Sequence, residues 1–290
     1  MSDRCFEHTP VLLKETIELL DPKDEGTYVD CTLGGGGHAE ELKIKNAKCK
    51  IIGIDRDREA IEAAKKRLSG HKGIEFIHDN FSNLKQHLKE KVDGVLFDLG
   101  VSSYQLDEAS RGFSLREDGP LDMRMDRAQK LTAEELVDRS DPQELERIFR
   151  EYGEERFARR ISNAICVKRN AKKIETTFEL KEIIEKAIPT WRKRESVTRI
   201  FQALRIAVNR ELDNLEIALR DAIERLKPKG RIVVISYHSL EDRMVKNIFR
   251  NAAREDKLKL LTKKPISPSA FEASSNPRAR SAKLRAAAKT

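Results

Sequence analysis

The stretch Tyr28-Val-Asp-Cys-Thr-Leu-Gly-Gly-Gly-Gly-His38 decides the fold of this chain. An apolar segment runs directly into four glycines, which is the pattern of a buried strand, a tight turn and the start of a helix. Backbone N–H groups in such a turn can approach a ligand at the N-terminus of the helix. The spacing Gly34-x-Gly36-x-x-Ala39 also satisfies the dinucleotide pattern G-x-G-x-x-A, so the turn alone leaves the class of ligand open.

Strand-like and helix-like segments alternate around this turn. Strands are predicted over residues 28–33, 50–55, 74–79, 93–98 and 231–236, and a helix over 58–68. Alternation of this kind predicts a parallel sheet with crossover helices. Two further strands, near 258–262 and 282–287, are close enough to form a hairpin that adds an antiparallel strand. That ending is typical of methyltransferases and not of dinucleotide dehydrogenases.

Between residues 106 and 212 the alternation stops and helix signals take over. Three helix starts are marked, by Thr132 with Glu135, by Asp141 before Pro142, and by Thr176 with Glu179. A long amphipathic run from Thr198 to Leu226 leads back to the sheet. We therefore predict an α/β fold with a discontinuous Rossmann-like domain, residues 1–105 and 213–290, and an inserted all-helical domain, residues 106–212.

The composition indicates an ionic surface and a partner rich in phosphate. The formal net charge is +8 and 37% of the residues are charged. The sequence has no apolar run of roughly 18 residues and no signal peptide core, so a cytoplasmic location and no membrane contact are expected. Cys5, Cys31, Cys49 and Cys166 are scattered without a C-x-x-C pair, and we expect no metal site.

Two predicted strand ends offer groups for an adenosine ligand. Asp55 follows the glycines by about 20 residues, at a strand end where a carboxylate accepts hydrogen bonds from ribose hydroxyls. The next strand ends in His78-Asp79-Asn80-Phe81, with a polar group for an adenine amine and an aromatic face for the ring. This combination suits S-adenosyl-L-methionine, although Phe81 could equally begin the core of the next helix.

Asp98 ends the predicted strand 93–98 at the carboxyl edge of the sheet, where amino-methyltransferases hold the acceptor that faces the target amine. The amine of cytosine delocalises its lone pair into the ring, so methylation needs an oxygen acceptor that holds the N–H bonds. Asp98 has this chemistry and is the candidate catalytic residue. It could instead bind the methionine part of the cofactor or cap the following turn.

Ten motifs together resemble the RsmH (MraW) family of ribosomal RNA cytosine-N4 methyltransferases. In chain order they are HTPVLL at residues 8–13, DCTLGGGGH, GIDRD, FDLGVSS with QLD, RGFS, LDMRMD, YGEERFARRI, TRIFQALRIAVNREL, ISYHSLEDRMVK and NPRARSAKLR. The resemblance covers nearly the whole chain. One departure is that DLGVSS stands where amino-methyltransferases in general carry an acidic or Asn residue, Pro-Pro and an aromatic residue.

The resemblance implies a class I S-adenosylmethionine-dependent methyltransferase that modifies N4 of a cytidine in the decoding centre of small-subunit (16S) ribosomal RNA. By position, it assigns cofactor contacts to Gly36, Gly37, His38, Asp55, Phe81, Asp98 and Gln105. His38 and Gln105 come from the resemblance alone. The expected partner is small-subunit ribosomal RNA or the assembled small subunit, and the protein could act as a monomer or a dimer.

Candidate substrate contacts lie after two strands and in the insertion. They are Ser102, Tyr104, Tyr237, His238, Arg159, Arg160, Lys168 and Arg169. Either tyrosine could stack a displaced base. Ser239 is expected to cap the helix over residues 240–251, which leaves His238 at the sheet edge near phosphate or base, although a lone histidine is more often structural.

Two other functions remain open at this point. A nicotinamide-dependent dehydrogenase would account for the glycines and Asp55, but not for DLGVSS or the basic insertion. An RNA-binding ribosome assembly factor with a vestigial cofactor pocket would account for the charge equally well.

Overall fold

The computed structural model describes residues 10–290, which form two compact units. The first, here the sheet unit, contains the described residues up to Gly100 together with Leu212–Thr290. The second, the helical unit, is Val101–Glu211. The boundary expected at residue 105 thus lies at residue 100, so Ser102, Tyr104 and Gln105 belong to the helical unit.

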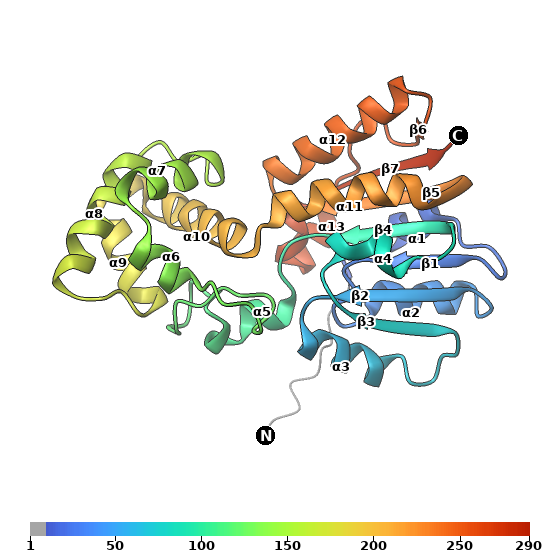
Figure 1. The fold of residues 1–290 in the computed structure, drawn as a ribbon, viewed down its shortest axis with the longest axis horizontal. Helices are drawn as coiled ribbons and strands as arrows, with labels where there is room; N and C mark the ends of the chain where they lie inside the picture. The colour runs from blue at the N-terminus through green and yellow to red at the C-terminus, as the bar shows by residue number, and fades with distance from the viewer. Residues whose placement is uncertain (1–9) are drawn as a thin grey trace. The chain divides into compact units, whose positions relative to one another are not determined.

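A seven-stranded sheet forms the centre of the sheet unit (Figure 1). Its strands in chain order are β1 Thr27–Asp30, β2 Lys50–Asp55, β3 Ile74–His78, β4 Val92–Asp98, β5 Leu226–Ser236, β6 Leu258–Leu260 and β7 Lys283–Lys289. Their order in the sheet is β3-β2-β1-β4-β5-β7-β6. The first five strands pair in parallel, and β7 lies antiparallel between β5 and β6. The Rossmann-like α/β fold and the antiparallel final strand predicted from the sequence are confirmed.

Helices cover both faces of this sheet. The sheet unit contains α1 Leu13–Leu20, α2 Gly37–Lys45, α3 Arg58–Arg67, η1 Phe81–Asn83, α4 Leu84–His87, α12 Ser239–Arg254, α13 Ala270–Ser275 and η4 Pro277–Ser281, and most of α11 Glu211–Arg225. Successive strand residues point to opposite faces, so Tyr28 packs with residues of α1 and α2 while Val29 packs with residues of α11 and α12. Such two-sided burial explains the nearly continuous apolar runs of the strands.

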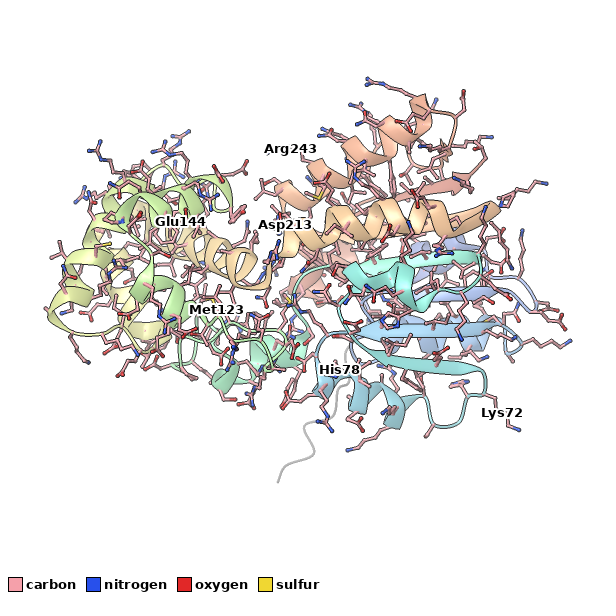
Figure 2. The ribbon with its side chains drawn as sticks, in the orientation of Figure 1. Lys72, His78, Met123, Glu144, Asp213 and Arg243 are labelled. Atoms are coloured by element: carbon pink, nitrogen blue, oxygen red, sulfur yellow. The ribbon has the colours of Figure 1, made fainter. Side chains whose placement is uncertain are left out.

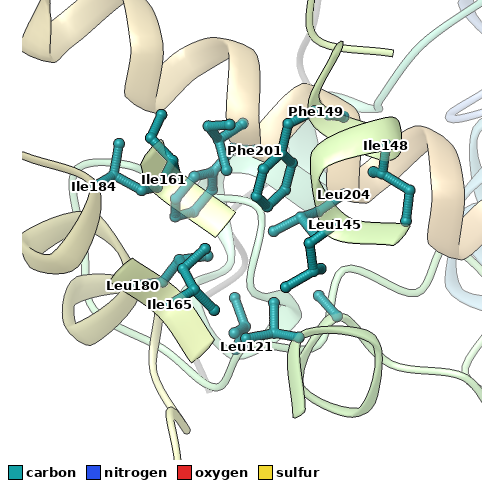
Figure 3. Close-up of a cluster of buried hydrophobic side chains, with 14 of the residues drawn as sticks. Leu121, Leu145, Ile148, Phe149, Ile161, Ile165, Leu180, Ile184, Phe201 and Leu204 are labelled. Atoms are coloured by element: carbon teal, nitrogen blue, oxygen red, sulfur yellow. The ribbon is translucent and has the colours of Figure 1, made fainter. Parts of the chain in front are cut away.

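The helical unit has its own apolar core. Its elements are α5 Ser103–Asp107, η2 Ala109–Arg111, α6 Ala133–Arg139, α7 Pro142–Glu151, α8 Ala158–Ala171, α9 Thr177–Ala187, η3 Thr190–Arg192 and α10 Lys193–Asn209. Figure 3 shows side chains from α7 to α10, among them Phe149, Ile161 and Phe201, converging with Leu121. The three predicted helix starts are confirmed, because Thr132, Asp141 and Thr176 each accept a hydrogen bond from a backbone N–H three residues on.

The amphipathic run predicted from Thr198 to Leu226 is two helices. Helix α10 ends at Asn209 and α11 begins at Glu211. Arg210 between them has a φ of 49°, a left-handed conformation that ends a helix. The periodicity of the side chains continues through the break, which is why the sequence did not reveal it.

A search of the described residues for membrane-spanning helices finds none that has the required length and apolar character.

Candidate cofactor and catalytic site

The site lies at the carboxyl ends of β1, β2 and β4. Strand β1 has β2 on one side and β4 on the other, so the chain order reverses between β1 and β4. In open parallel sheets, ligands bind outside the carboxyl ends of the strands at such a reversal. Three strands end there in an aspartate: Asp30, Asp55 and Asp98.

Asp30 and Asp98 are linked through the first residues of the glycine segment. The Asp30 carboxylate accepts a hydrogen bond from the Thr32 backbone N–H at 3.1 Å. The Thr32 hydroxyl oxygen in turn accepts one from the Asp98 backbone N–H at 2.6 Å. Burial raises the pKa of both carboxyl groups to about 7. Thr32 therefore links the ends of β1 and β4. The two aspartates at these ends lose their protons less readily than exposed carboxyl groups do.

Asp55 organises the glycine turn. Its Oδ2 accepts from the Gly34 N–H at 2.8 Å, and its Oδ1 accepts from the Asp57 N–H at 2.8 Å. Burial raises the pKa of Asp55 to about 6, although these two hydrogen bonds favour the charged form. The Gly34 N–H thus points at a carboxylate of the protein itself.

The glycines of the turn have different roles. Gly34 has a φ of 51°, which favours glycine, whereas a Cβ there would make only an ordinary contact of 3.9 Å with the carbonyl oxygen of Thr32. A Cβ on Gly36, which has a φ of 80°, would lie 2.9 Å from Leu68, and one on Gly37 would lie 2.4 Å from Pro10. Gly36 and Gly37 are therefore required for close packing of the turn against α3 and the segment before α1.

His38, in the first turn of α2, is a buried neutral imidazole. Its Nε2 lies 3.2 Å from the carbonyl oxygen of Val11, which can only accept, so Nε2 carries the proton. Burial lowers the pKa of the ring. Its Nδ1 therefore presents a lone pair, at 3.7 Å from Oδ2 of Asp98. Two acceptors at this distance form a site for a ligand N–H group.

Asp98 is held on its other oxygen by Tyr237. The Tyr237 hydroxyl donates to Asp98 Oδ1 at 2.7 Å, and this bond opposes the effect of burial on the pKa of Asp98. Gly100, with a φ of 90°, makes room for the ring, because a Cβ there would lie 3.3 Å from Tyr237. Asp98 thus has a fixed orientation, with Oδ1 satisfied and Oδ2 directed toward His38.

The end of β3 is more strongly tied to the protein than the sequence indicated. Asp79 accepts hydrogen bonds from the Asn80 N–H and the Asn83 amide, and its Oδ2 lies 2.6 Å from Nε2 of His87. Phe81 packs edge-on against Phe97 with ring centres 5.8 Å apart. Phe81 is therefore part of the core and remains only partly exposed. The turn that carries it follows His78, which Figure 2 labels.

The chemistry of the three aspartates fits a cationic, hydroxyl-bearing ligand better than a pyrophosphate. Buried carboxyl groups whose pKa is raised are stabilised in their charged form by a nearby positive charge. A sulfonium or ammonium group supplies that positive charge, and a ribose diol supplies hydrogen-bond donors. A pyrophosphate would be repelled, and the Gly34 N–H that could bind it is already donated to Asp55. A nicotinamide dinucleotide, which carries a pyrophosphate, is therefore disfavoured as the ligand.

In the helical unit, Ser102 and Gln105 form the capping box of α5. The Gln105 side-chain oxygen accepts from the Ser102 N–H at 3.1 Å, and the Ser102 hydroxyl accepts from the Gln105 N–H at 3.2 Å. Gln105 is buried. Both candidate residues thus position the start of α5, the helix that also carries Tyr104.

The expected cap of α12 is wrong by one residue. His238, not Ser239, is the N-cap, and its Nδ1 lies 3.4 Å from the Glu241 N–H that it accepts from. Glu241 in turn accepts from the backbone N–H groups of Tyr237 and His238. The sequence favoured Ser239 because serine is a common cap and histidine is not. The structure gives His238 the structural role considered for it.

The four basic candidates of α8 divide into two kinds. Arg159, Arg160 and Lys168 are exposed. Arg169 is partly buried, and its Nη1 donates to the carbonyl oxygens of Val137 and Ser140 at the end of α6. Arg169 therefore stabilises the C-terminus of a neighbouring helix.

Sequence reasoning missed a polar cluster in the helical unit. Arg111 is 1% exposed, and its Nη2 donates to the carbonyl oxygens of Arg124 and Met125. The Asn209 side chain donates to the carbonyl of Met123 and accepts from the N–H of Met125 (Figure 2 labels Met123). The motifs RGFS, LDMRMD and VNREL thus meet in one place. In the sequence, the only indication of this cluster was that all three motifs are present.

Known proteins resemble this chain over nearly its whole length. A model of the MraW methylase family matches residues 5–290. A protein from Halothermothrix orenii named ribosomal RNA small subunit methyltransferase H is 50% identical over 305 residues, which cover 97% of this chain and 98% of that protein. A protein of the same name from Clostridium botulinum is 50% identical over 302 residues, which cover 97% of this chain and 98% of that protein. Another from Carboxydothermus hydrogenoformans is 50% identical over 307 residues, which cover 98% of each chain.

Proposed function

The chain belongs to the MraW methylase family, and from that membership we propose that it transfers a methyl group from S-adenosyl-L-methionine to N4 of a cytidine in the decoding centre of small-subunit (16S) ribosomal RNA. The observation that carries the proposal is the arrangement of Asp98 at the sheet edge. One of its oxygens is occupied by Tyr237 and the other lies 3.7 Å from the neutral Nδ1 of His38. The relatives, named for ribosomal RNA of the small subunit, support the class of substrate.

Asp98 activates the target amine by accepting its N–H hydrogen bond. As this bond strengthens, the lone pair of N4 is less delocalised into the cytosine ring and becomes available for the new C–N bond. The proton that N4 loses passes to Oδ2 of Asp98. When bound, the cofactor supplies a methyl group on a positively charged sulfur, and the electron pair of the broken C–S bond returns to that sulfur.

The residues proposed to hold the cofactor are Gly36, Gly37, His38, Asp55, Phe81, Asp98 and Gln105. Asp55 would accept hydrogen bonds from the ribose hydroxyls, and Asp30 would add a negative charge beside them. Burial raises the pKa of the Asp98 carboxyl to about 7. A positively charged sulfonium held by these residues would favour the charged form of Asp98, which is the form that accepts a proton from N4.

The helical unit supplies the basic surface for RNA. Arg159, Arg160 and Lys168 are exposed and can contact phosphates, whereas Arg169 contributes by holding α6 against α8. Tyr104 and Tyr237 are the candidate aromatic contacts of the displaced base, with Ser102 and His238 acting through the helix starts that they cap. The site of action is the cytoplasm, on ribosomal RNA or on the assembled small subunit.

Methyl transfer to unmodified small ribosomal subunits tests this proposal. The protein is incubated with labelled S-adenosyl-L-methionine, and the RNA is digested to nucleosides for mass spectrometry. We expect N4-methylcytidine with the native protein and none with Asp98→Ala. Label in another nucleoside, or unchanged transfer by Asp98→Ala, would contradict it. Tight binding of subunits without transfer would favour an assembly factor.

A further inference from the structure

Trp191 is the only tryptophan of the chain, and it is exposed. It lies in η3, the short element between α9 and α10, and 74% of its surface is accessible. Single exposed apolar side chains are common on protein surfaces, and Phe271 is also exposed. What distinguishes Trp191 is the run of three basic residues that follows it, Arg192, Lys193 and Arg194.

One face of the indole ring is occupied by a cation. The guanidinium of Arg192 lies 4.6 Å from the ring centre and is paired with Glu195. Glu195 also binds Arg199 at 2.6 Å, so Arg192 is held in place by a network. An indole with a fixed guanidinium on one side presents the remainder of its surface as a rigid, flat platform.

Further basic residues either follow Trp191 in the chain or are joined to Arg192 through Glu195. Lys193 and Arg194 follow in the first turn of α10, and Arg194 is exposed. Arg199 reaches across to the carbonyl oxygen of Glu154, at 3.0 Å, which brings in the segment before α8 that carries Arg156. The hydrogen bond from Arg192 lowers the pKa of the Glu195 carboxyl, and the charges of Arg199 and Arg156 lower it further.

We propose that Trp191 and these basic residues form a binding surface for a single-stranded segment of RNA, with an unpaired base stacked on the indole. The surface, named here the Trp191 surface, consists of Trp191, Arg156, Arg192, Lys193, Arg194 and Arg199. Exposed Arg156 and Arg194 contact the phosphates on either side of the stacked base. This inference rests on the proposed function, because it assigns to the helical unit a specific contact with the RNA substrate.

Charge favours RNA over a protein partner at this surface. The set contains five cations, and Glu195 is the carboxylate that pairs with two of them, Arg192 and Arg199. A protein-binding patch is apolar in its centre, whereas Trp191 is followed directly by Arg192, Lys193 and Arg194. Aromatic rings in a basic groove are the common means of binding unpaired bases, which stack without regard to sequence.

Tryptophan fluorescence, excited at a wavelength that tyrosine does not absorb, reports on Trp191 alone, because the sequence has no second tryptophan. The native protein is titrated with a ten-nucleotide single-stranded RNA, and in parallel with the same strand annealed to its complement. We expect the single strand to quench the emission and the duplex to do so weakly, since paired bases are not free to stack. Binding of the single strand without quenching would overturn the proposal.

Variants then separate stacking from folding. Trp191→Ala should weaken binding of the single strand by roughly 5- to 150-fold, the range for loss of one stacked base, and Trp191→Phe should retain most of the affinity. Phe178→Ala is the matched control. Phe178 is exposed, with the Lys181 ammonium 5.0 Å from its ring centre, but it lies in the first turn of α9, at the opposite end from Trp191. It should bind RNA like the native protein.

Two further measurements keep the outcomes distinct. Methyl transfer is measured separately, by nucleoside analysis. Affinity and quenching therefore test the Trp191 surface even if no N4-methylcytidine forms and the proposed function fails. Sedimentation of the native protein and of Trp191→Ala tests the other partner, a second copy of the chain. If Trp191→Ala alters the oligomeric state and leaves affinity for the single strand unchanged, the surface is a protein interface and the proposal is wrong.

Discussion

The two units bury charged side chains in opposite ways. In the helical unit, Arg111 is almost fully enclosed, and the chain itself supplies carbonyl oxygens for its guanidinium. In the sheet unit, Asp30 and Asp98 end neighbouring strands, and burial raises the pKa of each to about 7. A buried charge that the chain satisfies holds the fold together. A carboxyl group whose ionisation the fold opposes indicates a ligand that brings positive charge.

The largest effect is expected when the reacting carboxyl group is neutralised without change of shape. Asp98→Asn should lower kcat by about 10²- to 10⁴-fold, because the amide no longer accepts a proton from N4. Single-turnover transfer to small ribosomal subunits measures this. The variant should unfold no more easily than the native protein, and a kcat within threefold of native would show that Asp98 is not the acceptor.

The charge in the helical unit should affect stability instead. Arg111→Met leaves the carbonyl oxygens of Arg124 and Met125 without these donors and should cost about 3 kcal/mol of unfolding free energy. Urea unfolding followed by circular dichroism provides the value. Arg147→Met is the control, because Arg147 forms its ion pairs with Glu144 and Glu151 on the surface. It should cost less than about 1 kcal/mol.

The stability of the cofactor-free protein should fall as pH rises from about 4 to about 7. Burial raises the pKa of Asp30, Asp55 and Asp98 from the ordinary 3.8 to about 7, 6 and 7, so the folded state binds more protons than the unfolded state in this window. In Asp98→Asn, the free energy of unfolding should decline over this pH range by less than in the native protein, with a difference on the order of 1 kcal/mol or more. Thermal unfolding at pH 5 and pH 8 tests it. An equal decline in native protein and variant would contradict the raised pKa of Asp98.

A smaller effect on the reaction than that of Asp98→Asn is expected from loss of the hydrogen bond that orients Asp98. Tyr237→Phe removes one hydrogen bond to a carboxylate, worth about 1–3 kcal/mol, so kcat/KM should fall by roughly 5- to 100-fold. Because the Tyr237 bond lowers the pKa of Asp98, its loss should also move the acidic limb of the kcat/KM profile to higher pH. A purely structural role for Tyr237 would leave that limb in place.

The sequence predicted the elements and the strand ends, but not the contacts between distant residues. Asp98 could be placed because a polar residue after a buried strand marks the ligand edge of a parallel sheet, and Thr176 could be placed because a cap is a local motif. The hydrogen bond between Tyr237 and Asp98 joins residues 139 positions apart. The two residues come together only because strands β4 and β5 pair side by side in the sheet. Arg111 was missed because an isolated arginine is expected at the surface.

Strand β7 has a consequence for how the protein is made. It is inserted between β5 and β6, and its first residue pairs with Ser236, 47 positions earlier in the chain. During synthesis, β5 therefore emerges as an edge strand with unpaired backbone groups, and remains so until residues 283–289 follow. An exposed edge can pair with other chains, so the nascent protein passes through a stage that is prone to aggregation and suited to chaperone binding.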